Sequence, residues 1–209
     1  MLMKDNSMTS SITPRRRTFI VSAALTLLVS GLAVSGCAES APDASSQQAG
    51  DGLLADHDLE GLDAAAIIER LDTMPVAQRP ADLMASIRPD SLLLSDDGGR
   101  EAELPMPRDV VYVSVAPYLN ETHECYYHSL TTCTGELASA DISVTLTDDS
   151  GDVLVDDVLT TYDNGFVGLW IPRDLGATLT ASYAGRSATT SVSTRSDDDA
   201  TCITTLHLI

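Results

Sequence analysis

Lysine is almost missing from this 209-residue chain, and aromatic residues make up only 4% of it. The sequence has 12 lysine and arginine residues against 31 acidic ones, which gives a formal net charge of −19, and no lysine follows Lys4. A surface of this charge repels phosphate backbones and anionic lipid headgroups. The composition therefore argues against nucleic-acid binding, and any attachment to a membrane needs a separate anchor.

The sequence signatures of common hydrolases and nucleotide-binding enzymes are also missing. There is no Gly-x-Ser-x-Gly nucleophile elbow, no His-Glu-x-x-His zinc helix, no P-loop and no dinucleotide-binding glycine motif. We therefore predict a protein that is not an enzyme, with redox chemistry of its cysteines left open. The many acidic residues are interpreted as a solvated surface.

The first 36 residues have the composition of an export signal. Arginines precede an apolar run over residues 21–34, which is shorter than the roughly 20 residues that a membrane-spanning helix needs. Residues 16–20 resemble a twin-arginine motif, and residues 34–37 (Val-Ser-Gly-Cys) resemble a bacterial lipobox. We predict lipidation of Cys37 and anchoring on the outer face of the cytoplasmic membrane. After removal of residues 1–36 the formal charge is −22.

The remaining chain divides by composition into three parts. Residues 37–57 are small and polar and predict a flexible tether. Residues 58–90 form a helical N-terminal part: Asp63 is a candidate N-cap before an Ala-Ala-Ala-Ile-Ile run, and a second short helix is expected from Pro80 to about Ile87. Residues 91–209 form a β-rich domain that we expect to bind metal.

Short apolar stretches separated by turn residues recur throughout the β-rich part. We expect strands over residues 110–116, 142–147, 153–160, 166–171, 177–183, 187–193 and 202–208. This spacing indicates a sandwich or barrel. The predicted fold class is therefore α+β, a small helical part packed with a β-sandwich or barrel-like domain, in which Phe166 and Trp170 are expected core anchors.

Cysteine and histidine gather in two segments, residues 122–133 and the C-terminal residues 201–207. The 68 residues between Cys133 and Cys202 contain neither type. With Cys37 assigned to lipid, three cysteines remain in an oxidising compartment, and one disulfide would leave a free thiol. We interpret Cys125, Cys133 and Cys202 as a thiolate metal site that the fold assembles.

Thiolates are soft ligands that select copper(I) or zinc over magnesium, calcium or manganese. The eight-residue separation of Cys125 and Cys133 differs from the Cys-x-x-Cys knuckle of structural zinc sites. Three sulfurs suit a low-coordinate copper(I) ion, whereas zinc needs a fourth ligand, which a histidine can supply. His123 and His128 are the candidates.

Two geometric expectations accompany this site. In a strand over residues 202–208, His207 faces away from Cys202, so it is the poorest candidate ligand. Hydroxyl groups beside the cysteines are expected to donate hydrogen bonds to the sulfurs. These hydroxyls belong to Thr131, Thr132, Thr201 and Thr204.

The two segments resemble the CueP family of copper-binding proteins of the bacterial cell envelope. The resemblance covers roughly residues 60–209 and lies in Thr-His-x-Cys-x-x-His-Ser-Leu-Thr-Thr-Cys-x-Gly-Glu-Leu (122–137), Asn-Gly-Phe (164–166), Trp170 and Thr-Cys-Ile-Thr-Thr-Leu (201–206). It implies copper binding, buffering or supply by the three cysteines, a helical part before a β-rich domain, and a homodimer. Because this chain has a lipobox, buffering at the membrane surface is favoured over delivery to a soluble enzyme.

Three functions follow from the same cysteines. The leading hypothesis is an envelope copper(I)-binding lipoprotein that buffers copper or acts as a chaperone in copper resistance, with a copper-receiving envelope protein as its partner. The second is a thiol/disulfide redox protein or reductase, in which two cysteines form a reversible disulfide that the third resolves. The third is zinc binding with an added histidine, and a purely structural disulfide is the remaining alternative.

Overall fold

The structure, a computed structural model, describes residues 44–209. The predicted export signal, the predicted lipidation at Cys37 and the start of the predicted tether lie outside the described residues. Helices α1 (Ala44–Asp56) and α2 (Ala64–Asp72) and the 3₁₀ turn η1 (Val76–Gln78) come first. Ten strands follow in the described residues: β1 (Leu83–Ile87), β2 (Ser91–Asp96), β3 (Glu101–Pro105), β4 (Val110–Val115), β5 (Asp141–Asp148), β6 (Val153–Thr160), β7 (Val167–Pro172), β8 (Gly176–Tyr183), β9 (Arg186–Ser193) and β10 (Cys202–Ile203).

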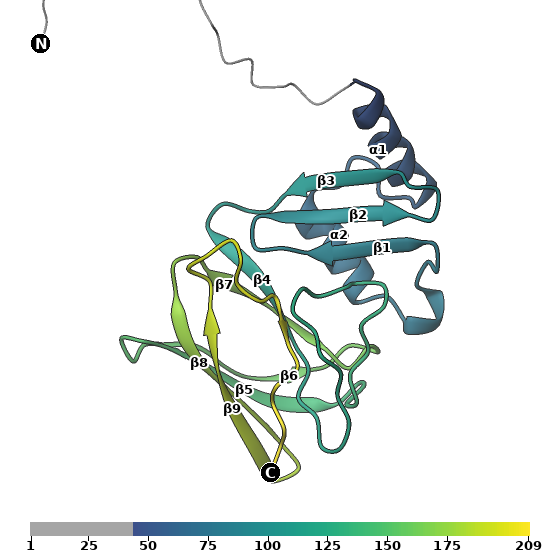
Figure 1. The fold of residues 1–209 in the computed structure, drawn as a ribbon. Helices are drawn as coiled ribbons and strands as arrows, with labels where there is room; N and C mark the ends of the chain where they lie inside the picture. Colours follow the sequence, from purple (N-terminus) through teal and green to yellow (C-terminus); the bar gives the residue numbers. More distant parts are fainter. Residues whose placement is uncertain (1–43) are drawn as a thin grey trace, which may run out of the picture. The chain divides into compact units, whose positions relative to one another are not determined.

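The predicted α+β class is confirmed. Two α-helices stand at the N-terminal side, and three sheets make up most of the rest (Figure 1). None of the helices in residues 44–209 is both long enough and apolar enough to cross a bilayer.

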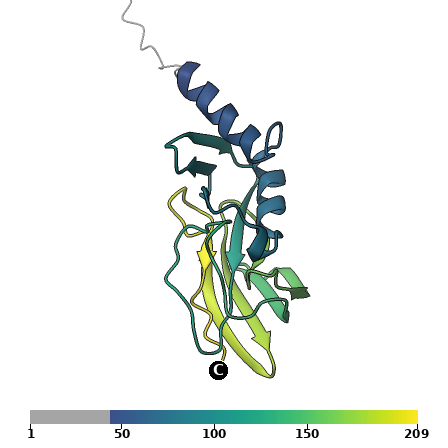
Figure 2. The ribbon, with the colours of Figure 1, turned by 90° about the vertical axis from the view of Figure 1, so that its right-hand side faces the viewer.

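Helix α2 begins where the sequence predicts, because the Asp63 carboxylate accepts a hydrogen bond from the N–H of Ala66 at 2.8 Å. Its buried face repeats at three- and four-residue spacing over Ala64, Ile67, Ile68, Leu71 and Asp72. This face packs on the sheet β1–β2–β3 and forms an apolar core with residues of α1, β1 and β2. Figure 2 shows both helices on one side of that sheet.

Two predictions about this N-terminal part are wrong. The segment predicted as a second helix up to Ile87 is strand β1, which pairs antiparallel with β2, because its buried residues alternate along the strand: Leu83, Ala85 and Ile87. Residues 44–56, expected in the tether, form α1. Its Leu53 is fully buried, and Gly50 lets the helix approach the backbone of β3 closely.

The remaining strands form a sandwich, as expected. Sheet β10–β4–β7 faces the antiparallel sheet β6–β5–β8–β9, and aliphatic side chains of both fill the space between them. The expected last strand is shorter than predicted, since only β10 pairs, parallel to β4, and the chain beyond Ile203 makes an isolated bridge at His207. Phe166 is fully buried, as expected, whereas Trp170 is wrong as a core anchor because it is 39% exposed.

A third, small cluster lies apart from the two larger cores. Ala116, Cys133, Phe166 and Cys202 form it, and Cys125 packs against it. Its residues come from the long loop after β4, the segment before β7, and β10. The fold therefore gathers the cysteines where the sandwich borders the N-terminal sheet.

Candidate metal centre

The loop between β4 and β5, residues 116–140, is fixed near its middle to strand β1. The N–H of Leu130 donates to the carbonyl of Ala85 at 2.9 Å, and the carbonyl of His128 accepts from the N–H of Ile87 at 2.8 Å. The Leu130 side chain is fully buried in the N-terminal core. An apolar anchor and two backbone hydrogen bonds therefore hold the middle of an otherwise irregular loop.

The last cysteine reaches the loop through β10. Cys202 lies opposite Ser114 of β4 in the parallel pair, and its N–H donates to the carbonyl of Tyr126 at 3.1 Å. The hydroxyl of Thr201 accepts from the N–H of His128 at 3.1 Å. These bonds bring residues more than 70 positions apart in the sequence to one place.

Four of the predicted residues meet there. One ligand atom from each of Cys125, His128, Cys133 and Cys202 lies within 4.8 Å of all the others. The sulfurs of Cys125 and Cys133 are 3.5 Å apart, and His128 Nδ1 is 3.7 Å from the sulfur of Cys202. His128 is fully buried, Cys133 and Cys202 are buried, and Cys125 is partly buried. Three sulfurs and one imidazole nitrogen thus converge in a largely dry site.

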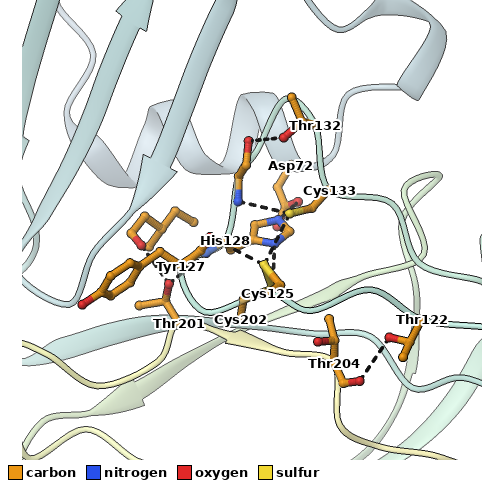
Figure 3. Close-up of a disulfide and its surroundings, with 12 residues drawn as sticks. Asp72, Thr122, Cys125, Tyr127, His128, Thr132, Cys133, Thr201, Cys202 and Thr204 are labelled. Atoms are coloured by element: carbon orange, nitrogen blue, oxygen red, sulfur yellow. Dashed lines mark hydrogen bonds and ion pairs between the residues drawn. A yellow bond between two sulfur atoms is a disulfide. The ribbon is translucent and has the colours of Figure 1, made fainter.

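Cys125 and Cys202 form a disulfide, and Cys133 is a buried free thiol (Figure 3). The two joined residues have Cα atoms 5.7 Å apart, a usual separation for such a bond. The structure therefore shows the oxidised form of two of the three cysteines. The third sulfur lies against one end of the bond.

The free thiol lies in surroundings that favour its thiolate. Burial raises the pKa of Cys133, but a hydrogen bond from His128 and its charge outweigh this effect. The N–H of Ser129, 3.4 Å from the sulfur, and the imidazole of His123 lower the pKa further, to about 7. A thiol with such a pKa is about half ionised at pH 7, and the thiolate is the form that binds a soft metal.

His128 is held from the opposite side by a buried carboxylate. Its Nε2 lies 3.3 Å from Asp72 Oδ1, and its ring packs against Phe166 with the centroids 4.5 Å apart. Burial lowers the pKa of His128, yet the hydrogen bond to Asp72 and the contacts with Cys133 raise it above its ordinary value. The imidazole therefore contacts the sulfurs through one nitrogen and the carboxylate through the other.

The other two histidines of these segments do not join the four groups. His123 lies close enough to Cys133 to lower its pKa, and its ring is edge-on to Phe166 at 6.2 Å, while its buried Nε2 finds no hydrogen-bond partner among the described residues. His207, predicted as the poorest ligand, stacks on Tyr118 at 4.9 Å. Of the two candidate histidines, the structure brings His128 to the sulfurs.

The expected threonine donors to sulfur are wrong within the described residues. Thr132 donates to the hydroxyl of Ser129 at 2.7 Å, and Thr201 donates to the carbonyl of Ile87 at 2.8 Å. The backbone N–H of Ser129 contacts the Cys133 sulfur instead. A backbone donor leaves no residue-type signal in a sequence, so this contact could not be read from composition.

Sequence reasoning missed Asp72. Its position four residues after Ile68 places it on the apolar face of α2, where a carboxylate is unexpected. That mismatch between residue type and helical face was the available signal. Its distance in sequence from the cysteine segments concealed the connection.

The geometry can be compared with known proteins. A model of the family described as "Periplasmic copper-binding protein CueP" matches residues 66–207. The chain belongs to the CueP family. The matched range includes Asp72 and all four groups of the cluster. A family of periplasmic copper-binding proteins agrees with a site of three sulfurs and one imidazole.

A solved structure, "Crystal Structure of S.CueP", is similar to this CueP-family chain. The two share 39% sequence identity with a TM-score of 0.70, and the match covers 76% of this chain and 96% of that one. A search of curated proteins found no match. The resemblance seen in the cysteine segments is thus confirmed over most of the described residues.

Proposed function

We propose that this chain is an envelope lipoprotein that binds copper(I) through Cys125, Cys133 and Cys202, with His128 as the fourth group of the site. The observation that carries this proposal is the convergence of their four ligand atoms within 4.8 Å. Sulfur-rich sites select soft, monovalent copper over the hard cations that an acidic surface also attracts. Membership of a copper-binding family supports the same cargo.

Copper binding in this site requires the reduced protein. The disulfide between Cys125 and Cys202 occupies two of the three sulfurs, and a disulfide sulfur is a far poorer ligand than a thiolate. A dithiol reductant can supply the two electrons and two protons that convert the bond to two thiols, becoming a disulfide itself, and these thiols lose their protons as the metal binds. The redox state of one bond therefore decides whether the chain stores or releases copper.

The proposed location follows from the first 37 residues. A lipid on Cys37 would tether the domain on the outer face of the cytoplasmic membrane, where it buffers copper and hands it to an envelope protein, giving copper resistance. The acidic surface favours cations near the site and disfavours direct contact with anionic lipids. Labelled fatty acid incorporated into the parent chain, and lost in Cys37→Ser, would support the anchor; equal incorporation in both would contradict it.

The deciding experiment is an anaerobic copper(I) titration of the reduced protein against a chromogenic chelator, with a count of free thiols before reduction. We expect one tightly bound equivalent after reduction and none in the oxidised protein. Zinc is the competing metal, because three sulfurs and one imidazole also satisfy tetrahedral zinc. Displacement of bound zinc by copper(I), without the reverse, would assign the cargo. Failure to compete with the chelator would contradict a copper role.

A second function, thiol/disulfide exchange, is favoured by the position of Cys133. Its sulfur is 3.5 Å from that of Cys125, one end of the disulfide. The Cys133 thiolate can attack Cys125; the bond to Cys202 then breaks, and Cys202 leaves as a thiolate while a new disulfide forms. One thiolate and one disulfide react and one of each is formed, so the exchange needs no external oxidant or reductant. Mass mapping of the disulfide after brief incubation at alkaline pH tests it, since a single unchanged pairing would argue against exchange.

A further inference from the structure

Asp72 is buried where neither helix stability nor packing favours a carboxylate. It is the last residue of α2, and the negative end of the helix dipole lies there. Its side chain is fully buried, a position that costs free energy for an ionised group unless it is fully hydrogen-bonded. The helix dipole and the cost of burial both disfavour a carboxylate here, so groups outside the helix must stabilise it.

The carboxylate is saturated with donors from three different segments. Tyr112 donates to Oδ2 at 2.8 Å and Asn164 donates to Oδ1 at 2.7 Å, while His128 Nε2 lies 3.3 Å from Oδ1. The Arg79 guanidinium, almost fully buried, lies 4.0 Å away and supplies a counter-charge. Burial opposes ionisation, but the hydrogen bonds and charge of His128, with the other two donors, lower the pKa of Asp72.

The approach of Tyr112 to Asp72 depends on a gap in the neighbouring strand. The Tyr112 hydroxyl occupies the space that a side chain at position 168 would fill, and that position is Gly168. Tyr112 and Asn164 are themselves almost fully buried. Residues of the sandwich therefore fix the carboxylate that helix α2 contributes.

An ionised carboxylate accepts hydrogen bonds and donates none. The nitrogen of His128 that faces Asp72 must therefore carry a hydrogen. In the neutral imidazole this leaves Nδ1 with its lone pair directed towards the sulfurs, 3.7 Å from Cys202 (Figure 3), whereas the imidazolium carries a hydrogen on Nδ1 as well and donates it to the Cys133 thiolate. Phe166 packs against the same ring and limits its rotation. Metal-binding histidines commonly have such a carboxylate on the distal nitrogen.

We propose that Asp72 is a positioning residue of the metal centre: it fixes His128 in the tautomer that presents Nδ1 to the metal. The inference rests on the proposed function, because it gives the imidazole the role of a ligand. It also makes helix α2 part of the site. The N-terminal layer then contributes chemistry as well as packing, although it holds no cysteine or histidine of the cluster.

The first test reads the tautomer directly in the full-length protein. Long-range proton–nitrogen NMR spectra of the oxidised, ¹⁵N-labelled chain distinguish Nδ1–H from Nε2–H once the pH is raised until the two ring nitrogens of His128 show the separate shifts of a neutral imidazole. We expect His128 to carry its hydrogen on Nε2. A hydrogen on Nδ1 would overturn the proposal without any variant being needed, and whether or not the protein binds copper.

Variants of Asp72 then distinguish the effect of its hydrogen-bond acceptor on His128 from the effect of its side-chain volume on packing. Asp72→Ala should allow His128 to adopt the other tautomer and weaken copper(I) binding by about 10- to 100-fold. Asp72→Asn should keep the parent tautomer and lose at most about tenfold, because its carbonyl oxygen can face Asn164 and His128 while its amide faces the Tyr112 oxygen. Parent-like tautomer and affinity in Asp72→Ala would contradict the proposal.

Ile68→Ala is the matched control. It removes a fully buried side chain from the same face of α2 but no hydrogen bond of Asp72 or His128, so its tautomer should match the parent and the copper(I) affinity of the folded protein should stay within about threefold. If it weakens binding as much as Asp72→Ala, the effect is general destabilisation and the proposal fails. If the parent itself binds no copper(I), the proposed function fails, while the tautomer still decides whether Asp72 orients His128.

Discussion

The two large cores of the described chain bury different kinds of side chain. The sandwich core is aliphatic throughout, with fully buried residues such as Ile142 and Leu179 from facing sheets. The N-terminal core is also apolar, but it includes Tyr112 and borders the buried Asp72 and His128. One core holds the fold together, and the other also reaches the cysteine cluster.

The difference shows how the small third cluster can be both buried and reactive. Cys133 and Cys202 sit beside the apolar Phe166, which keeps water away. From the N-terminal side, polar groups reach them through His128 with its carboxylate, and through Arg79, which donates to the Cys133 carbonyl at 2.8 Å. Substitutions in the sandwich should therefore change stability, whereas substitutions at the cluster should change metal binding.

The largest expected effect is the loss of a sulfur ligand. Cys125→Ser, Cys133→Ser and Cys202→Ser should each weaken copper(I) binding by more than about 1,000-fold, because a hydroxyl is a hard and rarely ionised replacement for a thiolate. Chelator competition on the reduced protein measures this. Cys37→Ser is the control, since that residue is expected to carry lipid and should leave affinity unchanged. Parent affinity in all three variants would refute the site.

Shortening a core side chain of the sandwich should lower stability and leave copper(I) affinity unchanged. Leu179→Ala removes a fully buried side chain between the two sheets and should lower the free energy of unfolding by about 2–5 kcal/mol. The affinity of the folded protein for copper(I) should stay near the parent value. Urea unfolding and chelator competition on the same sample test both parts. If Leu179→Ala weakened copper(I) binding by the folded protein as well as stability, packing of the sandwich core would also control the metal centre.

The sequence allowed much of the sandwich to be predicted, because turn residues and β-branched runs mark strands β4 to β9 closely. The cysteines could be assigned to one site because few other residues bind soft metals. The N-terminal part was harder: Leu83 to Ile87 fits both helical and strand spacing when only three apolar positions are present, and pairing with β2 decides it. The approach of Asp72 to His128 is a tertiary contact across 56 positions and has no local pattern.

The influence of His128 on Cys133 predicts a measurable pH dependence. The pKa of Cys133 is lowered from 9 to about 7 despite burial, which raises it. In the oxidised Cys37→Ser protein, ultraviolet thiolate absorbance should therefore be half developed near pH 7. His128→Ala removes the main lowering influence, so thiolate at pH 7 should fall to a few per cent, roughly that of a thiol of pKa 8.5. An unchanged titration in the variant would show that His128 does not control this thiol.

The same shift has consequences for stability. The folded-state pKa of Cys133 lies below its unfolded value, so ionisation of this thiol stabilises the oxidised fold. This contribution is fully present above the unfolded pKa and is lost as the pH falls through about 7. The parent should therefore gain stability relative to Cys133→Ser between about pH 7 and 9. Denaturant titrations of both proteins across this range check the sign. A gain towards acid pH would contradict the assigned direction.

The smallest expected effect concerns the exposed end of the site loop. Glu136 accepts hydrogen bonds from the N–H groups of Leu119, Asn120 and Glu121, and the Asn120 backbone and side-chain bonds are the main cause of its pKa falling to about 2. Glu136→Gln should leave stability and copper affinity nearly unchanged but speed hydrogen exchange at these three amides. Any stabilisation from the carboxylate is present above its unfolded pKa of 4.5 and is lost as the pH falls through about 2. Parent-like exchange in the variant would mean that the loop relies on its buried anchor, Leu130, alone.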